Sequence, residues 1–354
     1  MKSVHVLPLP FYKTLFVLLC VALVICLWNE FDLGLGVDVD EDLVLSKLDN
    51  VTEAATTHKV CNVNLVDRRA HLGSPPHRNL TVIYYVTPTY PRPNQVPELT
   101  RLSHSLMHVP GLHWIVANDH DACDPRVHSI LQRSGLPFTH ISSPKPPQLN
   151  LLRLMPRGVT NRRAALRWIT SEPRQGVLYF GDDDNSVDLD LFDEIRKTRK
   201  LSMFPVGLIA EYGVSSPVLQ GGKVIGFFDS WPGARRFAVD MAGFAVNLQH
   251  LAPAAAMPYK AGFEEDGFLK SNGFTLEDVE PLADNCTRVL VWHTRSVIPK
   301  KKQLKVHLDS DRLDKFDNLR TLLTTVRDMN MAGLSPDQGI SPSVYNNRFS
   351  EGLA

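Results

Sequence analysis

The stretch Gly176-Val177-Leu178-Tyr179-Phe180-Gly181-Asp182-Asp183-Asp184-Asn185 joins a short apolar run to three consecutive acids. Residues 177–180, bounded by residues that break regular structure, are predicted to form a buried strand. Three adjacent carboxylates repel one another unless a cation or hydrogen-bond donors neutralise them. Because open α/β sheets bind ligands at the carboxyl ends of their strands, the run predicts a divalent metal holding a diphosphate. The alternative is an acidic loop that caps a helix starting near Asp188 or Asp190.

Strands and helices alternate on both sides of this stretch. We expect strands at 80–86, 113–117 and 177–180, and helices at 96–107, 160–170 and 189–198. This alternation predicts a mainly parallel sheet with helices on both faces. Beyond about residue 203 the pattern mixes, with strands expected at 206–209, 223–228 and 289–294. This half is predicted to be a second subdomain packed on the same sheet.

The amino-terminal region predicts a membrane anchor followed by a stem. Thr14 to Asn29 is an uncharged run, with lysines before it and acids after it, which favours a cytoplasmic amino terminus. A cleaved signal peptide is the competing interpretation, although no small-x-small cleavage site follows Trp28. We expect a cytoplasmic tail (1–13), a signal anchor (14–29) and a lumenal stem (30–78). Glycosylation is then expected at the sequons of Asn50, Asn79 and Asn285.

We expect the rest of the chain to divide into a half that binds the diphosphate ligand as donor (79–200), a half that binds an acceptor (201–300) and a carboxyl-terminal extension (301–354). The extension holds one candidate helix, 313–329, and a polar end that we expect to be partly disordered.

Composition limits the classes of partner. The 38 basic and 38 acidic side chains balance, so the chain gives no global argument for a nucleic-acid partner and we expect none. Three cysteines follow the expected anchor, Cys61, Cys123 and Cys286, without a CxxC pair that would indicate zinc. Their number is odd, and Cys61 in its polar surroundings is the better candidate for a bridge to a second chain.

Charged and aromatic residues follow several of the predicted strands. Oxygen ligands such as Asp182 to Asp184 suit Mg²⁺ or Mn²⁺. Arg157 and Arg162 are candidates to bind phosphate. Their alternative is a solvated basic face shared with nearby arginines at 153, 163, 167 and 174. Tyr90 is a candidate to stack on a base, and the alternative is a partly buried loop aromatic. Asp119 is a candidate to accept a hydrogen bond from a base or ribose, and the alternative is a turn residue.

A second group of candidates follows residue 230. Asp240 lies inside an apolar stretch, where a buried carboxylate is costly without partners. Either Arg235 or Arg236 pairs with it, or Arg235 and Asp240 together bind hydroxyls of an acceptor. The acids at 264–266 offer a general base, or else stabilise the start of a helix. His293 and Arg295, at the end of the predicted strand 289–294, are candidates to meet phosphates or a donor sugar.

These segments together carry a family resemblance. Tyr179 to Asn185, Val239 to Ala245 and Asn285 to Arg295 resemble the animal β-1,3-glucuronosyltransferases of glycosyltransferase family 43. Val86 to Tyr90, Leu112 to Trp114 and Pro156 to Val159 add to the match, which runs from about residue 80 to about 299. The resemblance implies a nucleotide-sugar-binding, Rossmann-like mixed sheet of glycosyltransferase A type with a packed acceptor-binding subdomain. It also implies a type II Golgi membrane protein and a homodimer.

The resemblance also implies a role for each matching residue. It places the nucleotide at Tyr90, Asp119, Arg157, Arg162, Asp182 and Asp183, Mn²⁺ at Asp184, and the diphosphate and donor sugar at His293 and Arg295. It places the acceptor sugar at Arg235 and Asp240 and the catalytic base at Glu265, with Glu264 adjacent if the register slips by one. Where the family often has a glutamate that contacts the acceptor, this chain has Ser215 without a gap, or Glu211 with a shifted alignment.

The reaction so implied is transfer of glucuronate from UDP-glucuronate to a terminal galactose of a glycan, with inversion and a β1,3 linkage. The acceptor is then the proteoglycan linkage trisaccharide or the N-acetyllactosamine ends of glycoproteins and glycolipids. Two alternatives are a non-catalytic lumenal glycan-binding scaffold and a metal-dependent sugar-nucleotide hydrolase.

Overall fold

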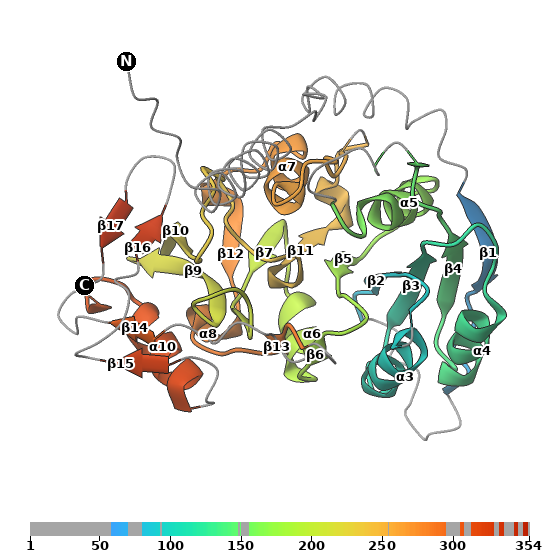
Figure 1. Ribbon diagram of the computed structural model, residues 1–354, viewed down its shortest axis with the longest axis horizontal. Helices are drawn as coiled ribbons and strands as arrows, with labels where there is room; N and C mark the ends of the chain where they lie inside the picture. The colour runs from blue at the N-terminus through green and yellow to red at the C-terminus, as the bar shows by residue number, and fades with distance from the viewer. Residues whose placement is uncertain are drawn as a thin grey trace, which may run out of the picture. The chain divides into compact units, whose positions relative to one another are not determined.

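Figure 1 shows the computed structural model, which describes residues 58–69, 80–92, 94–147, 149, 156–253, 255–294, 305–307, 313–328, 333–335, 343–345 and 350–352. The chain divides into two units, Met1–Leu48 and Asp49–Ala354, and every described residue belongs to the second. The predicted anchor, Asn50, Asn79 and Arg295 lie outside the described residues. No helix in the described ranges is long and apolar enough to cross a membrane.

The larger sheet has eight strands in the order β1-β4-β3-β2-β5-β11-β7-β12. In that order they are Lys59–Asn64, Phe138–Ser142, Leu112–Asn118, Ile83–Thr89, Val177–Phe180, Phe244–Asn247, Leu201–Met203 and Val279–Pro281. β4, β3, β2 and β5 are mutually parallel, whereas β1 and β11 run antiparallel to their neighbours. The sheet is therefore mixed, and β5 spans the predicted residues.

Helices cover both faces of the parallel part. α3 (Gln95–Leu106) and α4 (Pro125–Ser134) lie on one side of the sheet, and α5 (Val159–Thr170) on the other (Figure 1). The chain runs from β2 through β3 to β4 in one direction and then returns past β2 to β5. The strand order thus reverses between β2 and β5, at the point where open α/β sheets bind ligands.

A second sheet has the order β17-β16-β10-β9-β8-β13-β6. Its strands are Ser350–Gly352, Ser343–Tyr345, Lys223–Phe228, Val214–Gln220, Val206–Gly207, Val291–Trp292 and Ser186–Val187. α10 (Leu319–Asp328) packs against it, with Leu319, Leu322 and Leu323 in one apolar cluster with residues of β9 and β10. The remaining elements are α6 (Asp190–Ile195), α7 (Glu264–Ser271), α8 (Ala283–Cys286), the short 3-10 helices η3 (Met241–Gly243), η4 (Leu248–His250) and η5 (Leu276–Asp278), and the parallel pair β14 (Lys305–His307) and β15 (Gly333–Ser335).

Some predicted elements are shorter than expected. The strand expected at 206–209 ends at Gly207, because Leu208 adopts a left-handed backbone conformation (φ 58°) that a continuing strand does not allow. The strand expected at 289–294 is regular only at Val291–Trp292. The helix expected at 313–329 begins later, at Leu319.

Gly181 makes the turn from β5 into the acidic run. A Cβ atom at this position would lie 2.0 Å from the hydroxyl oxygen of Tyr85, a fully buried side chain of β2. The backbone therefore passes too close to the tyrosine ring for any residue other than glycine. This close approach holds the start of the acidic run against the sheet.

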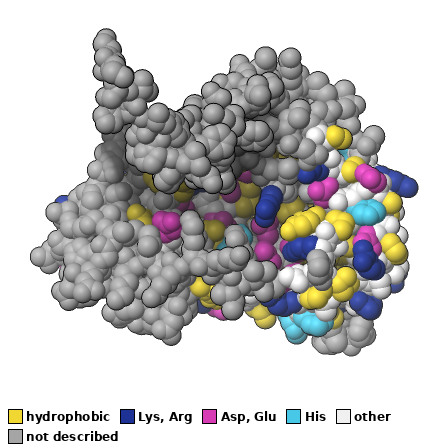
Figure 2. Space-filling model, viewed as in Figure 1, with side chains coloured by type: hydrophobic (Ala, Val, Ile, Leu, Met, Phe, Trp, Pro, Cys, Tyr) yellow, Lys and Arg dark blue, Asp and Glu magenta, His cyan; other side chains and the backbone are white. Residues whose placement is uncertain are grey.

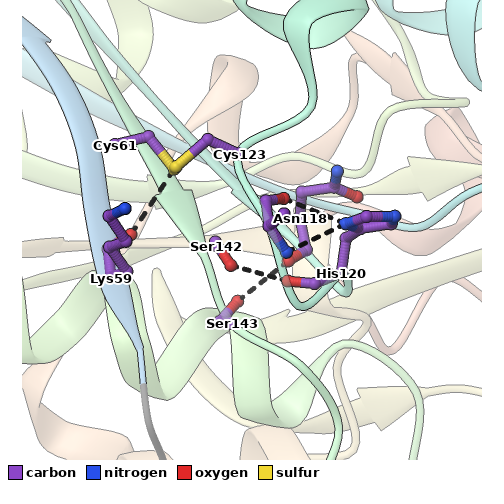
Figure 3. The surroundings of a disulfide bond; sticks show 8 residues. Lys59, Cys61, Asn118, His120, Cys123, Ser142 and Ser143 are labelled. Atoms are coloured by element: carbon purple, nitrogen blue, oxygen red, sulfur yellow. Dashed lines mark hydrogen bonds between the residues drawn. A yellow bond between two sulfur atoms is a disulfide. The ribbon is translucent and has the colours of Figure 1, made fainter.

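A disulfide joins Cys61 of β1 to Cys123 in the loop before α4 (Figure 3). The expectation that Cys61 bridges to a second chain is therefore wrong, and the remaining described cysteine, Cys286, is buried. Cys61 lies where the register of β1 against β4 shifts, so its side chain is at an irregular point of the ladder. The pairing was missed because the sequence around Cys61 does not predict an edge strand.

Candidate active site

The carboxyl ends of β2 and β5 meet at the reversal of strand order, and the three acids lie there. The alternative that these acids cap a helix is wrong, because the backbone N–H of Asp190 donates to the side chain of Asp188 instead (2.9 Å). Each of the three has a different environment.

Asp183 is buried and fully paired. Arg92 donates from Nη2 to Oδ1 (2.6 Å) and from Nη1 to Oδ2 (2.8 Å), and the Thr89 hydroxyl donates to Oδ2 (2.6 Å). Burial raises the pKa of Asp183, while Arg92 and Thr89 act in the opposite direction. A bidentate guanidinium pair of this kind fixes the orientation of the carboxylate. Asp183 therefore has little capacity left to bind a metal.

Asp182 lies between Arg162 and His293. Arg162 donates to Oδ1, and Nε2 of His293 lies 3.9 Å from Oδ2. The Arg162 side chain is buried and also donates to the carbonyl oxygen of Arg157 (3.1 Å). Arg162 is therefore not part of a solvated basic face, whereas the side chain of Arg157 is exposed.

Asp184 is the acid whose carboxylate remains open. Its carbonyl oxygen accepts hydrogen bonds from Arg101 (2.8 Å) and from the Thr294 hydroxyl. Among the residues that the structure describes, none donates to its carboxylate. Burial, followed by the charge of Asp182, raises the pKa of Asp184 to about 6. A cation would relieve this unfavourable burial of charge.

The chemistry of these donors fits a hard divalent ion. In the described part of the chain, no group of three or more His, Cys, Asp or Glu side chains is placed to hold a metal. Mg²⁺ and Mn²⁺ commonly take one or two carboxylates and complete their coordination with water and substrate phosphates. Asp184, whose carboxylate accepts no hydrogen bond from the described residues, is a candidate for such a partial site.

The candidate nucleoside contacts lie at the ends of β2 and β3. Tyr90 is 45% exposed, and the Arg92 guanidinium lies 4.5 Å from its ring centroid. Oδ1 of Asp119 accepts from the backbone N–H of Lys145 (2.6 Å), and the Asp119 N–H donates to the Thr89 carbonyl (2.8 Å). Both residues therefore lie at the carboxyl ends of the neighbouring strands β2 and β3.

A second cluster of charges surrounds Arg235, which is buried. Its Nη2 lies 3.5 Å from Oδ1 of Asp229 and donates to the Trp231 carbonyl (2.5 Å), and its Nη1 lies 3.9 Å from Oε2 of Glu265. The guanidinium also lies over the Trp231 ring, 4.7 Å from the centroid. Asp240 caps η3 by accepting from the Ala242 N–H (2.9 Å).

Three adjacent acids in the first turn of α7 have different surroundings. Asp266 accepts from the backbone N–H groups of Arg236 (2.7 Å) and Phe237 (2.9 Å), and is a structural residue. Burial raises the pKa of Glu265 to about 8, and the charges of Glu264 and Asp240 add to this shift. Burial also raises the pKa of Glu264, which the charges of Arg162 and Arg235 lower. The charges of Arg162 and Arg235 thus both act on the start of α7.

Trp231 exposes 47% of its surface next to this cluster. Gly262 allows this position, since a Cβ there would lie 2.5 Å from the indole ring, and Phe263 packs edge-on against it (5.8 Å between centroids). Figure 2 shows acidic and basic side chains beside one another near the middle of the described surface on this face.

Sequence reasoning missed Arg92, Trp231 and Asp229. A usable signal existed for Arg92, because it follows Tyr90 by two residues in the loop after a strand. For Asp229 the signal is weak, since an acid after a strand is common and its neighbours become apparent only in the fold. Asn285 is exposed, so its sequon is accessible, and its glycosylation stays a prediction.

Comparison with known proteins identifies the family. The family described as Glycosyltransferase family 43 matches residues 102–297. The chain belongs to glycosyltransferase family 43. It is 50% identical over 298 residues to galactosylgalactosylxylosylprotein 3-beta-glucuronosyltransferase S of Drosophila melanogaster, covering 82% of this chain and 72% of that protein.

Two further family 43 relatives are more distant. Galactosylgalactosylxylosylprotein 3-beta-glucuronosyltransferase 2 of Homo sapiens is 42% identical over 66% of this chain and 76% of its own. Galactosylgalactosylxylosylprotein 3-beta-glucuronosyltransferase sqv-8 of Caenorhabditis elegans is 39% identical over 72% and 74%. Membership of the family makes the chain a glycosyltransferase.

Proposed function

We propose that this family 43 enzyme transfers glucuronate from UDP-glucuronate to the 3-hydroxyl of a terminal galactose, with inversion and a β1,3 linkage. The proposed acceptor class is the galactosylgalactosylxylosyl glycan of proteoglycans, because the relatives' names specify it. The observation that carries the proposal is the position of α7. In its first turn Oε2 of Glu265 lies 3.9 Å from Nη1 of Arg235, and the charge of Arg162 acts on the adjacent Glu264. We infer that the diphosphate binds on the Arg162 side of this turn and the acceptor sugar on the Arg235 side.

The donor side suits a nucleoside diphosphate sugar. Arg162 and His293 flank Asp182, so they are placed to bind the diphosphate and to stabilise charge on the leaving UDP. Tyr90 and Asp119, at the ends of β2 and β3, would contact the uridine, and the exposed Arg157 would contact the nucleotide. Mn²⁺ held by Asp184 would supply a Lewis acid for the departing phosphate.

Glu265 is the proposed general base. In a single displacement it takes the proton of the galactose 3-hydroxyl while that oxygen bonds to the anomeric carbon, and the bond to UDP breaks. A pKa raised to about 8 makes its carboxylate a stronger base than an ordinary glutamate. Arg235 lies 3.9 Å away and keeps the carboxylate oriented. The acceptor sugar would meet Arg235 and Asp240, with the exposed ring of Trp231 as an apolar surface for its C–H groups.

The cellular setting is part of the proposal. We infer a single-pass type II Golgi membrane protein with its catalytic part in the lumen, glycosylated at its sequons, and a homodimer. The supporting observation is the uncharged run 14–29 with lysines before it and acids after it. The disulfide gives no support for a covalent dimer, because Cys61 is paired within the chain.

The test uses the full chain in detergent, UDP-glucuronate and Mn²⁺. The acceptors are a galactosyl-galactosyl-xylose trisaccharide and N-acetyllactosamine, and the product linkage is determined by NMR. We expect a β1,3-glucuronosyl product from the trisaccharide. Release of UDP without any acceptor product would indicate a sugar-nucleotide hydrolase. Preference for N-acetyllactosamine would overturn the proposed acceptor class but not the reaction.

A further inference from the structure

Asp229 is a buried acid beside Arg235, and the proposed reaction assigns it no role. It directly follows β10, whose Phe228 pairs with Ser216 of β9 in the antiparallel ladder. The next residues along the two strands are Asp229 and Ser215, which are therefore cross-strand neighbours. They expose 8% and 1% of their surfaces. The Ser215 hydroxyl is close enough to lower the pKa of Asp229, which burial raises.

The contacts of Asp229 point it toward the reacting groups. Its Oδ1 accepts from the Trp231 N–H (2.7 Å) and lies 3.5 Å from Nη2 of Arg235. The same guanidinium reaches Glu265 with its other terminal nitrogen. One arginine therefore lies between Asp229 and the proposed base. A carboxylate has about four lone-pair sites, so these contacts leave acceptor capacity on Asp229.

The charges around Arg235 do not balance. Asp229 and Glu265 both contact it, and the charge of Asp240 raises the pKa of each of them. Among the described residues, three acids thus lie near this one guanidinium, and two of them, Asp229 and Glu265, face it directly. Buried acceptors are costly unless donors reach them. The hydroxyl groups of a neutral sugar would supply such donors.

We propose that Asp229 binds a non-reacting hydroxyl of the acceptor galactose and thereby selects the acceptor, an inference that rests on the proposed function. Ser215 stands where the family resemblance leads one to expect an acceptor-binding glutamate. Asp229 provides a carboxylate from the adjacent strand. In this chain the acid that recognises the acceptor would therefore follow β10, at Asp229, instead of lying on β9 at position 215.

The first test compares Asp229→Asn with wild type. The matched control is Asp121→Asn, which makes the same change at an exposed acid far from Asp229 in the sequence. A hydrogen bond to a charged group is worth enough to raise the KM for the galactosyl-galactosyl-xylose acceptor about 10- to 100-fold. We expect the KM for UDP-glucuronate to stay within about twofold of the wild-type value. The pH at which kcat falls on the acid side should also stay as in wild type. An unchanged acceptor KM would overturn the inference, and so would equal losses in both KM values.

The second test identifies the hydroxyl and separates binding from a structural role. Trisaccharides lacking the 2-, 4- or 6-hydroxyl of the terminal galactose are assayed with wild type and Asp229→Asn. The variant and one of the three deoxy acceptors should be non-additive, because they remove the same contact. Additive losses with all three would overturn the inference. A structural effect transmitted through Arg235 would be additive in this way.

A rescue variant covers the possibility that Asp229→Asn folds poorly. Asp229→Asn combined with Ser215→Glu returns a carboxylate to the neighbouring strand, and it should recover most of the acceptor KM. No recovery in a variant with a wild-type melting temperature would count against the inference. Failure of the proposed function has a different outcome, because wild type would then form no glucuronosyl product with any acceptor.

Discussion

Two sites each gather three acids but neutralise them differently: the donor edge at the ends of β2 and β5, where we propose that the donor binds, and the acceptor cluster around Arg235, where we propose that the acceptor binds. At the donor edge Asp183 has Arg92 and Thr89, Asp182 has Arg162, and Asp184 alone is open. Around Arg235, the acids Asp229, Asp240 and Glu265 share the surroundings of one guanidinium. At the first site only the carboxylate of Asp184 lacks a donor among the described residues, whereas at the second site three acids lie near one arginine.

This difference matches the charge of the two proposed ligands. A nucleotide diphosphate brings negative charge, so its site needs arginines and a cation, and carboxylates there must be restrained by firm pairing. A neutral sugar brings hydroxyl donors, so its site benefits from carboxylates in excess. Burial raises the pKa of the proposed base, Glu265, and the charges of Glu264 and Asp240 raise it further.

The largest expected effect is at the acceptor side. Glu265→Gln should lower kcat about a thousandfold, since a general base contributes on the order of 10²–10⁴ in rate. UDP binding, measured by calorimetry with Mn²⁺ present, should be retained. The matched control is Glu264→Gln, which should lose far less activity. If the control lost the activity and Glu265→Gln kept it, the base would be Glu264.

The next effect is at the donor side. Asp184→Asn should lower kcat about a hundredfold, because metal stabilisation of a leaving phosphate is worth several kcal/mol. Calorimetric titration of Mn²⁺ in the presence of UDP is expected to show the loss of the ion's tight binding. Unchanged Mn²⁺ affinity would mean that the ligand is elsewhere and that the open carboxylate has another purpose.

Pairing at the donor edge is tested by Arg92→Ala. This change removes two hydrogen bonds from Asp183 and leaves a buried carboxylate with one donor, so we expect the KM for UDP-glucuronate to rise about tenfold. The acceptor KM serves as the internal control and should remain near wild type. Comparable increases in both values would mean that Arg92 supports the fold as a whole.

The smallest effect concerns charge excess at the acceptor side. As the proposed base, Glu265 must be ionised to accept a proton, so we expect kcat/KM to fall as the pH drops below its raised pKa of about 8. The charge of Asp240 helps to raise this pKa, and Asp240→Asn should therefore move the acid limb of the profile to lower pH. A limb that stayed in place, or moved upward, would contradict the electrostatic account of the base. The acceptor KM should rise in the same variant.

The fold around β5 was predictable because local signals and global arrangement agree there. The strand 177–180 was predicted to the residue, and the parallel strands and helices near it were displaced by a few residues at most. Leu208 was not predictable, because its left-handed backbone follows from packing and not from residue type. α4 was missed although Asp124, Pro125 and Gly135 are ordinary start and stop signals.

The site was predictable to the extent that its residues follow strands in recognisable motifs. Asp182, Asp184 and Arg162 converge as expected, and Glu265 lies beside Arg235. Arg92 and Asp229 were missed because their partners, Asp183 and Arg235, are brought to them by the sheets. The sequence alone also could not separate Asp266 from Glu265, since three adjacent acids in a first helical turn differ only in what the fold places opposite each.

The disulfide between Cys61 and Cys123 also depends on the redox conditions of the compartment in which the chain folds. Such bonds form and persist in oxidising compartments and are rare in the cytosol. A copy of the chain that folded in the cytosol would carry two thiols, two hydrogen atoms heavier than one that passed through the secretory route. Mass spectrometry of the peptides that carry these two sulfurs would thus distinguish the two populations within one cell extract, without any assay of activity.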